Sequence, residues 1–313
     1  MRSPQTTPLP GLPERVTVYE VGARDGLQNE SAIVPVEVKA ELVRRLVAAG
    51  LPAVELTSFV SPRWVPQLAD AEQLLAALGP FDGPLLGGLR APVLVPNERG
   101  LERALAAGAR EVAVFVSATE SFARRNLGRS LREALDASAV VARGARDAGL
   151  AVRGYVSMCF GDPWEGDVDP ATVAGVAAEL VQQGCAEVSL GDTIGVATPG
   201  QVVDLLGRLD RAGVGREVLA VHFHDTYGQA LANTLVALQH GVTTVDASAG
   251  GLGGCPFAKS ATGNLATEDL VWQLHGLGVA TGVDLPALVA TSRWLAERLG
   301  RESPSRAVRA LAG

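Results

Sequence analysis

The stretch PVEVKAELVRRLVAAGLPAVELTS, residues 35–58, predicts one complete structural unit. Pro35 suits the first turn of a helix, and apolar residues recur on one face of the helix expected near 36–49. Gly50 follows as a left-handed C-cap, and the apolar run at 53–58 is typical of a strand that is buried on both faces in a parallel sheet. The unit is therefore a helix, a glycine and a strand.

This unit recurs along the chain. An Ala-rich amphipathic stretch ends in glycine, and a short apolar run follows, at Gly50, Gly108, Gly149, Gly184, Gly213 and Gly241. The apolar runs predict eight strands, at 16–21, 53–58, 89–95, 111–117, 151–157, 186–190, 218–224 and 243–248. Eight alternating strands and helices over about 250 residues indicate an α/β fold, the (β/α)8 TIM barrel, rather than a doubly wound sheet.

Both ends of the chain lie outside this pattern. We expect residues 1–15 to form a flexible N-terminal arm and residues 16–275 to form the barrel. Over 276–313, apolar residues such as Leu288 and Leu295 recur at helical spacing. They predict additional C-terminal helices that pack on the barrel.

Composition limits the partners of the protein. Of 313 residues, 47% are hydrophobic and 19% are charged, which indicates a folded globular chain. The net charge of -7 argues against nucleic acid or an anionic membrane as a partner. The chain lacks an apolar run of about 18 residues, and its N-terminus has neither a signal-peptide nor a transit-peptide pattern, so we expect a cytoplasmic protein. Three cysteines do not make a disulfide framework.

Polar side chains gather at the carboxyl ends of the predicted strands, where the active sites of such barrels lie. They include Arg24 and Asp25 after the first strand, Glu55 on the second, Asp192 after the sixth, His222 and His224 at the end of the seventh, and Asp246 on the eighth.

The segment VHFHD, residues 221–225, places two histidines at strand period. His222 and His224 therefore share one face, and the partner expected for both rings is a metal ion. Asp25 is the expected carboxylate ligand, its alternative being an exposed ion pair with Arg24. Asn264 could add an amide oxygen or could instead cap the next helix. A site of imidazole, carboxylate and amide favours Mg²⁺ or Mn²⁺.

The glycine-rich segment AGGLGGCPFAKSATGN, residues 249–264, predicts a mobile loop over the barrel mouth. Cys255 in this loop could donate or accept a proton, or could be an ordinary exposed thiol. Cys159 and Cys185 are expected to be packing residues.

Several long motifs resemble the hydroxymethylglutaryl-CoA lyase family over about 16–285, in the same order. They are VTVYEVGARDGLQNE, SFVSPRWVPQLAD, RGYVSMCFGDPWEG, SLGDTIGVATPG, VHFHDTYGQALANTLVAL and GLGGCPFAKSATGNLATEDLV. The resemblance implies a TIM barrel that uses a divalent metal and takes an acyl-CoA. Two features depart from the family pattern: Ser31 stands where a lysine is common, and 79–91 is a longer connection.

The resemblance also implies roles for particular residues. It assigns the metal ligands as Asp25, His222, His224 and Asn264, substrate binding to Arg24 and Gln28, and catalytic functions to Arg24, Cys255, Glu55, Asp192 and His222. His222 and Asp192 remain equal candidates for the base that takes a hydroxyl proton.

The implied reaction is a retro-Claisen cleavage of (S)-3-hydroxy-3-methylglutaryl-CoA to acetoacetate and acetyl-CoA, by a homodimer. One alternative is a related barrel lyase or synthase that acts on a different or longer hydroxyacyl-CoA. Gly254 and Cys255 favour the lyase, because such synthases usually carry Glu-Arg there. Further alternatives are a non-haem Fe(II) oxygenase with a His222, His224 and Asp25 triad, and a non-catalytic protein that binds acyl-CoA or metal.

Overall fold

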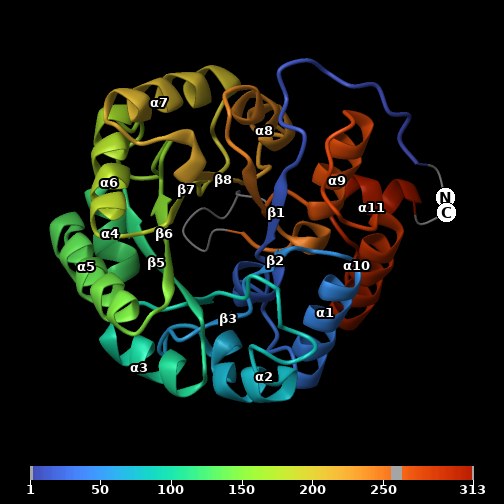
Figure 1. The fold of residues 1–313 in the computed structure, drawn as a ribbon, viewed down its shortest axis with the longest axis horizontal. Coiled ribbons are helices and arrows are strands. Elements are labelled where there is room, and N and C mark those ends of the chain that lie inside the picture. Colours follow the sequence, from blue (N-terminus) through green and yellow to red (C-terminus); the bar gives the residue numbers. More distant parts are fainter. Residues whose placement is uncertain (1–2, 255–262, 312–313) are drawn as a thin grey trace.

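The computed structural model describes residues 3–254 and 263–311. Parallel strands alternate with helices and curl around a central axis, with the helices outside (Figure 1). The strands are β1 (Thr17–Glu20), β2 (Ala53–Val54), β3 (Thr57–Ser58), β4 (Val93–Leu94), β5 (Glu111–Ser117), β6 (Ala151–Ser157), β7 (Glu187–Asp192), β8 (Leu219–Phe223) and β9 (Thr244–Ala247). Their order across the sheet is β2-β1-β9-β8-β7-β6-β5-β4-β3.

The sheet closes into a barrel because β2 and β3 are two halves of one strand. They occupy the two ends of the sheet and correspond to the single strand expected at 53–58. Between them, the backbone N–H of Glu55 donates to Glu20 O on β1 (2.8 Å), and that of Leu56 donates to Pro92 O beside β4 (3.0 Å). This strand therefore pairs on both sides, and the predicted (β/α)8 barrel is confirmed.

Apart from the split second strand, two strands have an end that differs by two residues or more from the one expected from the sequence. The third strand was expected over 89–95, but β4 spans only Val93–Leu94. Pro92 lacks an N–H group for the ladder, and Arg90 makes only an isolated bridge with Ala53. The sixth strand is longer than expected, so Asp192 is the last residue of β7 rather than a residue after it.

Nine helices of the described chain follow the strands around the outside of the barrel and extend to residue 276. They are α1 (Val36–Ala48), α2 (Ala71–Leu78), α3 (Glu98–Ala106), α4 (Glu120–Leu127), α5 (Leu131–Asp147), α6 (Pro170–Gln182), α7 (Pro199–Arg211), α8 (Ala230–Gln239) and α9 (Thr267–Gly276). Their buried faces and the outward faces of the strands form one continuous apolar core. None of the described helices is long and apolar enough to cross a membrane.

Gly50 shows why glycine ends the helix of the recurring unit. Its φ is +87°, and an added Cβ would lie 2.4 Å from the backbone oxygen of Gly282. Any other residue would therefore be strained and would also clash with backbone. The tight turn brings the chain directly from α1 into β2.

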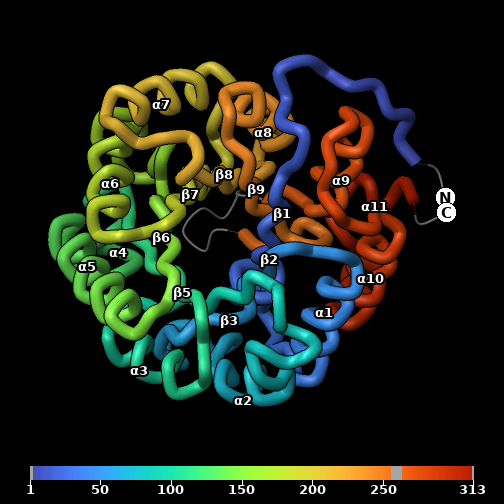
Figure 2. Tube along the Cα trace, in the orientation of Figure 1, coloured from blue at the N-terminus to red at the C-terminus, as the bar shows by residue number. Residues whose placement is uncertain are grey.

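The chain ends lie against the same side of the barrel (Figure 2). The N-terminal segment runs beside the end of α9, where the N–H of Thr7 donates to Gly276 O (2.8 Å). Two further helices, α10 (Leu285–Leu299) and α11 (Arg306–Leu311), pack with each other and with α9, and α10 also contacts α1. The division into a flexible arm (1–15), a barrel (16–275) and C-terminal helices (276–313) remains our proposal.

Candidate active site

Two histidines and one aspartate meet at the carboxyl ends of β8 and β1. His222 lies on β8 and His224 follows it, and their ring centroids are 5.4 Å apart, as expected from strand period. Asp25 lies in a π-helical turn, Gly22–Gly26, directly after β1. One potential ligand atom from each residue lies within 4.8 Å of the other two. The structure therefore brings the predicted triad to one point.

Asn264 lies beside this cluster, and its side chain does not cap the helix that follows it, α9. Its Nδ2 donates to Asp25 Oδ2 and to Leu252 O, both at 2.9 Å. The N-cap position of α9 is Ala266, so the helix-capping alternative is wrong. Asn264 Oδ1 is buried and accepts no hydrogen bond from the described residues. A buried amide oxygen without a donor fits a metal ligand, because leaving it unpaired would otherwise cost about 1–3 kcal/mol.

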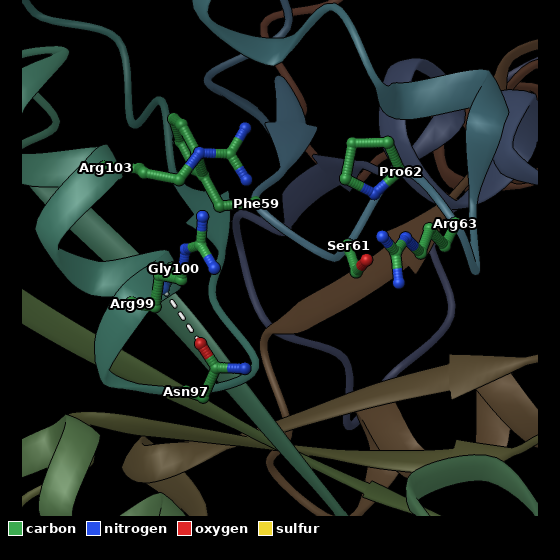
Figure 3. A pocket seen from close by; sticks show the side chains of 8 residues that line it. All are labelled: Phe59, Ser61, Pro62, Arg63, Asn97, Arg99, Gly100 and Arg103. Carbon is green, nitrogen blue, oxygen red and sulfur yellow. Dashed lines mark hydrogen bonds between the residues drawn. The ribbon is translucent and has the colours of Figure 1, made fainter.

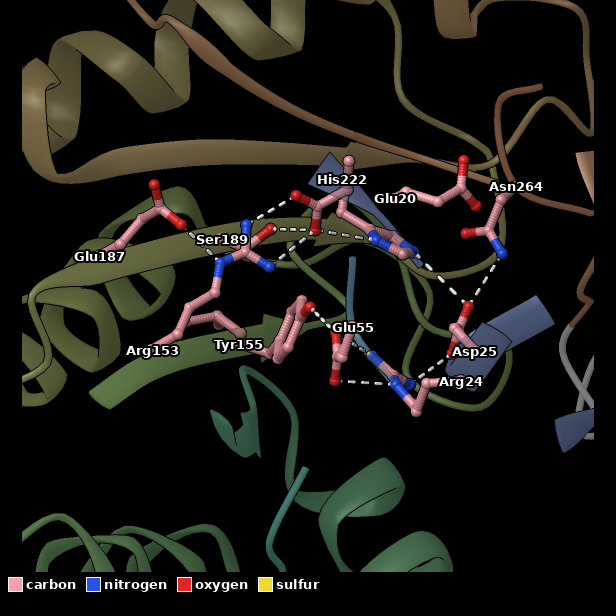
Figure 4. Close-up of polar contacts among 12 residues, drawn as sticks. Glu20, Arg24, Asp25, Glu55, Arg153, Tyr155, Glu187, Ser189, His222 and Asn264 are labelled. Atoms are coloured by element: carbon pink, nitrogen blue, oxygen red, sulfur yellow. Dashed lines mark hydrogen bonds and ion pairs between the residues drawn. The ribbon is translucent and has the colours of Figure 1, made fainter. Parts of the chain in front are cut away.

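The ring of His222 points toward Asp25 (Figure 4), and a contact with Asp246 on β9 orients the ring on its opposite side. Its Nδ1 lies 3.2 Å from Asp246 Oδ2, and because a carboxylate only accepts, this nitrogen carries the proton. The other nitrogen, Nε2, lies 4.0 Å from Asp25 Oδ2 and keeps its lone pair toward the cluster. A carboxylate that fixes the tautomer of a histidine in this way is the usual outer support of a metal-binding imidazole.

Asp246 is in turn held by buried cationic and hydroxyl groups. Arg153, on β6, donates from Nη2 to Oδ1 (2.6 Å) and from Nη1 to Oδ2 (3.1 Å), and Ser189 Oγ donates to Oδ2 (2.9 Å). Burial alone would raise the pKa of Asp246, but Arg153 and His222 lower it to about 2. The carboxylate therefore stays ionised behind His222.

Arg24 lies in the same turn as Asp25 and bridges two carboxylates. Its Nε donates to Glu55 Oε1 (2.9 Å), and its Nη1 donates to Asp25 Oδ1 (2.6 Å). The side chains of Arg24 and Asp25 are only 8% and 14% exposed, so the expected alternative of an exposed loop ion pair is wrong. Burial would lower the pKa of Arg24, but Glu55 and Asp25 outweigh it and raise that pKa. A permanently charged guanidinium is thus fixed beside the triad.

Tyr155, on β6, is a member of the site that the sequence analysis did not select. Its hydroxyl donates to Glu55 Oε2, and its ring packs edge-on against His222, with centroids 6.3 Å apart. Arg153 stacks over the same ring, at 4.6 Å from its centroid. Tyr155 therefore connects the Arg24–Glu55 pair with the residues behind His222.

Asp192 lies close to the triad but makes no hydrogen bond to it among the described residues. Its Oδ1 accepts from the N–H of Val196 (2.9 Å), and its Oδ2 accepts from the N–H of Ala197 (3.1 Å). Burial raises the pKa of Asp192 to about 6, although these N–H groups and His222 oppose the shift. A carboxylate with that pKa can exchange a proton near neutral pH.

The remaining predicted residues differ in their placement. Gln28 donates from Nε2 to Asp25 Oδ1 (2.8 Å), so it contacts the cluster. Cys255 lies outside the described residues. Cys159 and Cys185 are both buried free thiols, which confirms them as packing residues.

A (β/α)8 barrel with two histidines and a carboxylate converging at its C-terminal mouth defines a metal-dependent barrel enzyme. The HMGL-like family model matches residues 15–295, and the chain belongs to this family. The family is divalent-metal-dependent, and the cluster above can hold such an ion.

Individual relatives resemble the chain over nearly all of its length. Mitochondrial hydroxymethylglutaryl-CoA lyase of Arabidopsis thaliana is 54% identical over 96% of this chain, although the chain spans only 63% of that protein. The same-named protein of Rattus norvegicus is 52% identical over 99% of this chain and 94% of the relative. The crystal structure of hydroxymethylglutaryl-CoA lyase from Pseudomonas aeruginosa matches with a TM-score of 0.92 and 48% identity, covering 96% of this chain and 99% of that one.

Proposed function

We propose that this protein cleaves (S)-3-hydroxy-3-methylglutaryl-CoA to acetoacetate and acetyl-CoA in a divalent-metal-dependent reaction. The observation that carries the proposal is the convergence of Asp25, His222 and His224 beside the buried cation of Arg24. Relatives at about 50% identity bear the name of this lyase, which supports the choice of substrate.

The metal would be held by Asp25, His222, His224 and the Oδ1 atom of Asn264. When bound, a divalent ion supplies Lewis-acid polarisation of substrate oxygens. Oxygen and imidazole ligands without thiolate favour Mg²⁺ or Mn²⁺. Asp246 keeps His222 Nε2 available for that ion, because it occupies the opposite nitrogen of the ring.

The proton that leaves the C3 hydroxyl needs an acceptor among the chain's own groups. His222 has Nδ1 engaged by Asp246 and Nε2 directed at the cluster, so as a ligand it has no nitrogen left for a proton. We therefore assign the base to Asp192. As the C3 oxygen forms a carbonyl, the C2–C3 bond breaks and its electron pair moves into the enolate of acetyl-CoA.

Charge then develops on the thioester oxygen, and Arg24 is the group placed to neutralise it. A single fixed donor of this kind contributes roughly 3–4 kcal/mol to the transition state. Glu55 holds the guanidinium in place, and Gln28 holds Asp25. We assign to Cys255 the role of donating the proton that converts the enolate to acetyl-CoA.

The test is to supply the purified protein with this thioester and, separately, with longer 3-hydroxyacyl-CoA thioesters, and to identify the products. We expect equal amounts of acetoacetate and acetyl-CoA from the first substrate. Cleavage of a longer thioester alone would replace the proposed substrate, and iron-dependent oxygen uptake would support the facial-triad oxygenase instead.

Two further expectations accompany this function. We propose a homodimer. Light scattering on the purified protein tests this directly, since a monomer mass would contradict it. We also propose a cytoplasmic location, although the animal and plant relatives are named mitochondrial. Fractionation of the source cells would decide this.

A further inference from the structure

A row of charged side chains runs through the interior of the barrel. Such interiors are usually filled by branched apolar side chains, and charges are costly to bury. This charge row consists of Arg90, Glu111, Glu187, Arg153 and Asp246. The charges alternate along it, since Arg90 faces the two glutamates and Arg153 lies between Glu187 and Asp246. A set of charges this costly to bury needs a physical explanation beyond filling space.

The charge row starts at the amino end of the barrel. Glu111 and Glu187 are the first residues of β5 and β7, and both accept from Arg90 Nη2, at 2.6 Å and 3.3 Å. The Arg90 side chain is 38% exposed, against 13% for each glutamate. The triad lies at the opposite, carboxyl end, as does a hollow of about 570 Å³ between the loop after β3 and the start of α3 (Figure 3). Glu187 therefore acts on a metal or substrate bound at the mouth only through other residues.

Glu187 fixes one edge of the Arg153 guanidinium group. Its Oε1 accepts from Arg153 Nε at 2.6 Å, while both Nη atoms of Arg153 donate to Asp246. Burial would raise the pKa of Glu187, but Arg153 and Arg90 outweigh it and hold that pKa below the usual value, so the carboxylate stays charged. Arg153 Cζ also lies 3.7 Å from the centroid of the Tyr19 ring. Carboxylates at two edges and an aromatic ring over the plane thus fix the guanidinium.

The charge row continues through Arg153 to His222. Asp246 accepts from Arg153 and, at 3.2 Å, from His222 Nδ1, so the side chains from Glu187 to His222 form one hydrogen-bonded chain. This chain cannot relay protons, because an arginine does not release its proton in a protein. It acts through charge and position instead. Neutralising Glu187 would free one edge of Arg153 and leave Asp246 as its anionic partner among the described residues, which weakens the contact of Asp246 with the imidazole.

We propose that Glu187 is a positioning residue for the metal site. From the amino end of the barrel it fixes Arg153 and, through Asp246, keeps the ring of the metal-binding histidine directed at the ion. The inference rests on the proposed function, which places a divalent ion at His222. Figure 4 shows Glu187 and Asp25 at opposite ends of the connected side chains, with Arg153 next to Glu187.

The experiment compares Glu187→Gln with a matched control, Glu111→Gln. Both variants remove one carboxylate charge from the amino end and one ion pair with Arg90, but Glu111 makes no hydrogen bond with Arg153 among the described residues. The readout is the Kd of metal-stripped protein for Mn²⁺, measured by electron paramagnetic resonance. Glu187→Gln should weaken Mn²⁺ binding about 3- to 10-fold relative to the control, less than the loss of about 10- to 100-fold expected when a direct partner of a metal-binding histidine is removed.

A spectroscopic readout separates positioning from a general loss of stability. In metal-free protein with isotope-labelled histidine, the Nδ1 proton of His222 should resonate further upfield in Glu187→Gln than in Glu111→Gln, because its hydrogen bond to Asp246 is weaker. A merely structural role would lower the free energy of unfolding without moving this resonance or the Kd of the folded protein.

A charge-conserving pair, Glu187→Asp and Glu111→Asp, repeats the comparison in case Glu187→Gln does not fold. The shorter side chain lengthens the contact with Arg153 and should weaken Mn²⁺ binding about threefold in the first variant only. Equal Mn²⁺ affinities within a folded pair would overturn the inference. Mn²⁺ binding by wild type without cleavage of any thioester would overturn only the proposed reaction, and a wild type that binds no Mn²⁺ would overturn both.

Discussion

Replacing Asp246 by asparagine tests how His222 is held at the metal cluster. In the wild type, the charged carboxylate accepts the Nδ1 proton of His222 and two donors of Arg153. An amide keeps the size of the side chain, but it removes the charge and can itself donate to Nδ1. The imidazole would then lose the preference for presenting Nε2 to the metal.

The size of the effect follows from these contacts. Loss of an outer partner of a metal-binding histidine weakens metal binding about 10- to 100-fold, or roughly 1.4–2.7 kcal/mol. Among the residues that the structure describes, the variant also leaves the fully buried Arg153 with Glu187 as its remaining anionic partner, at 2.6 Å. Breaking such a buried pair destabilises a protein by roughly 3–5 kcal/mol, so unfolding must be measured alongside binding.

The assay is a titration of metal-stripped protein with Mn²⁺, followed by the electron paramagnetic resonance signal of the free ion. Ser189→Ala is the matched control, because it removes one hydrogen bond to the same carboxylate and keeps the charge. We expect the control to bind Mn²⁺ within about threefold of wild type, which corresponds to less than about 0.7 kcal/mol. Wild-type affinity in a folded Asp246→Asn variant would refute the reasoning.

Three other predictions follow from the site and from the buried carboxylates. Arg24→Met should lower kcat about 10²- to 10³-fold in a folded protein, and a near-normal kcat would exclude its charge-neutralising role. Tyr155→Phe removes one hydrogen bond to Glu55 and should lower the free energy of unfolding by about 1 kcal/mol in urea titrations, whereas an unchanged value would show that the bond contributes nothing. Burial raises the pKa of Glu268 to about 8 and that of Glu20 to about 7 from the ordinary 4.5, so the folded protein holds protons that the unfolded chain has released. The free energy of unfolding should therefore fall as pH rises from 5 to 8, by up to about 1.4 kcal/mol per unit for each group, and Glu268→Gln should flatten this fall; equal slopes would contradict the assignment.

The barrel and the triad could be predicted because their signals are local. Glycine after each helix and a short apolar run after each glycine determine the order of helices and strands, and the strand period places His222 and His224 on one face. Asp25 follows the first strand, and parallel strands bring such positions to one mouth. The role of Asn264 could not be predicted from the sequence alone, because an asparagine shortly before a helix can be either a helix cap or a metal ligand. Only the folded structure distinguishes the two.

Asp246 was among the polar residues expected at the barrel mouth, but its pairing with Arg153 and His222 was missed because these partners lie far away in the sequence. Arg153 and Asp246 are 93 positions apart and meet only inside the closed barrel. The sequence nevertheless contained an indication of this pairing. Arg153 and Asp246 are charged residues within strands that were predicted to be buried, and a buried charge requires a partner. The split of the second strand was also unpredictable, because it depends on pairing with both β1 and β4.

The most direct test of the central claim is acetoacetate release by metal-stripped protein as Mg²⁺ or Mn²⁺ is added back, for wild type and for His224→Ala. We expect no release without metal, release that saturates at about one ion per chain in wild type, and at least a tenfold higher metal requirement in the variant. Release by stripped wild-type protein, or a folded variant with an unchanged metal requirement, would contradict a metal-dependent cleavage at this cluster.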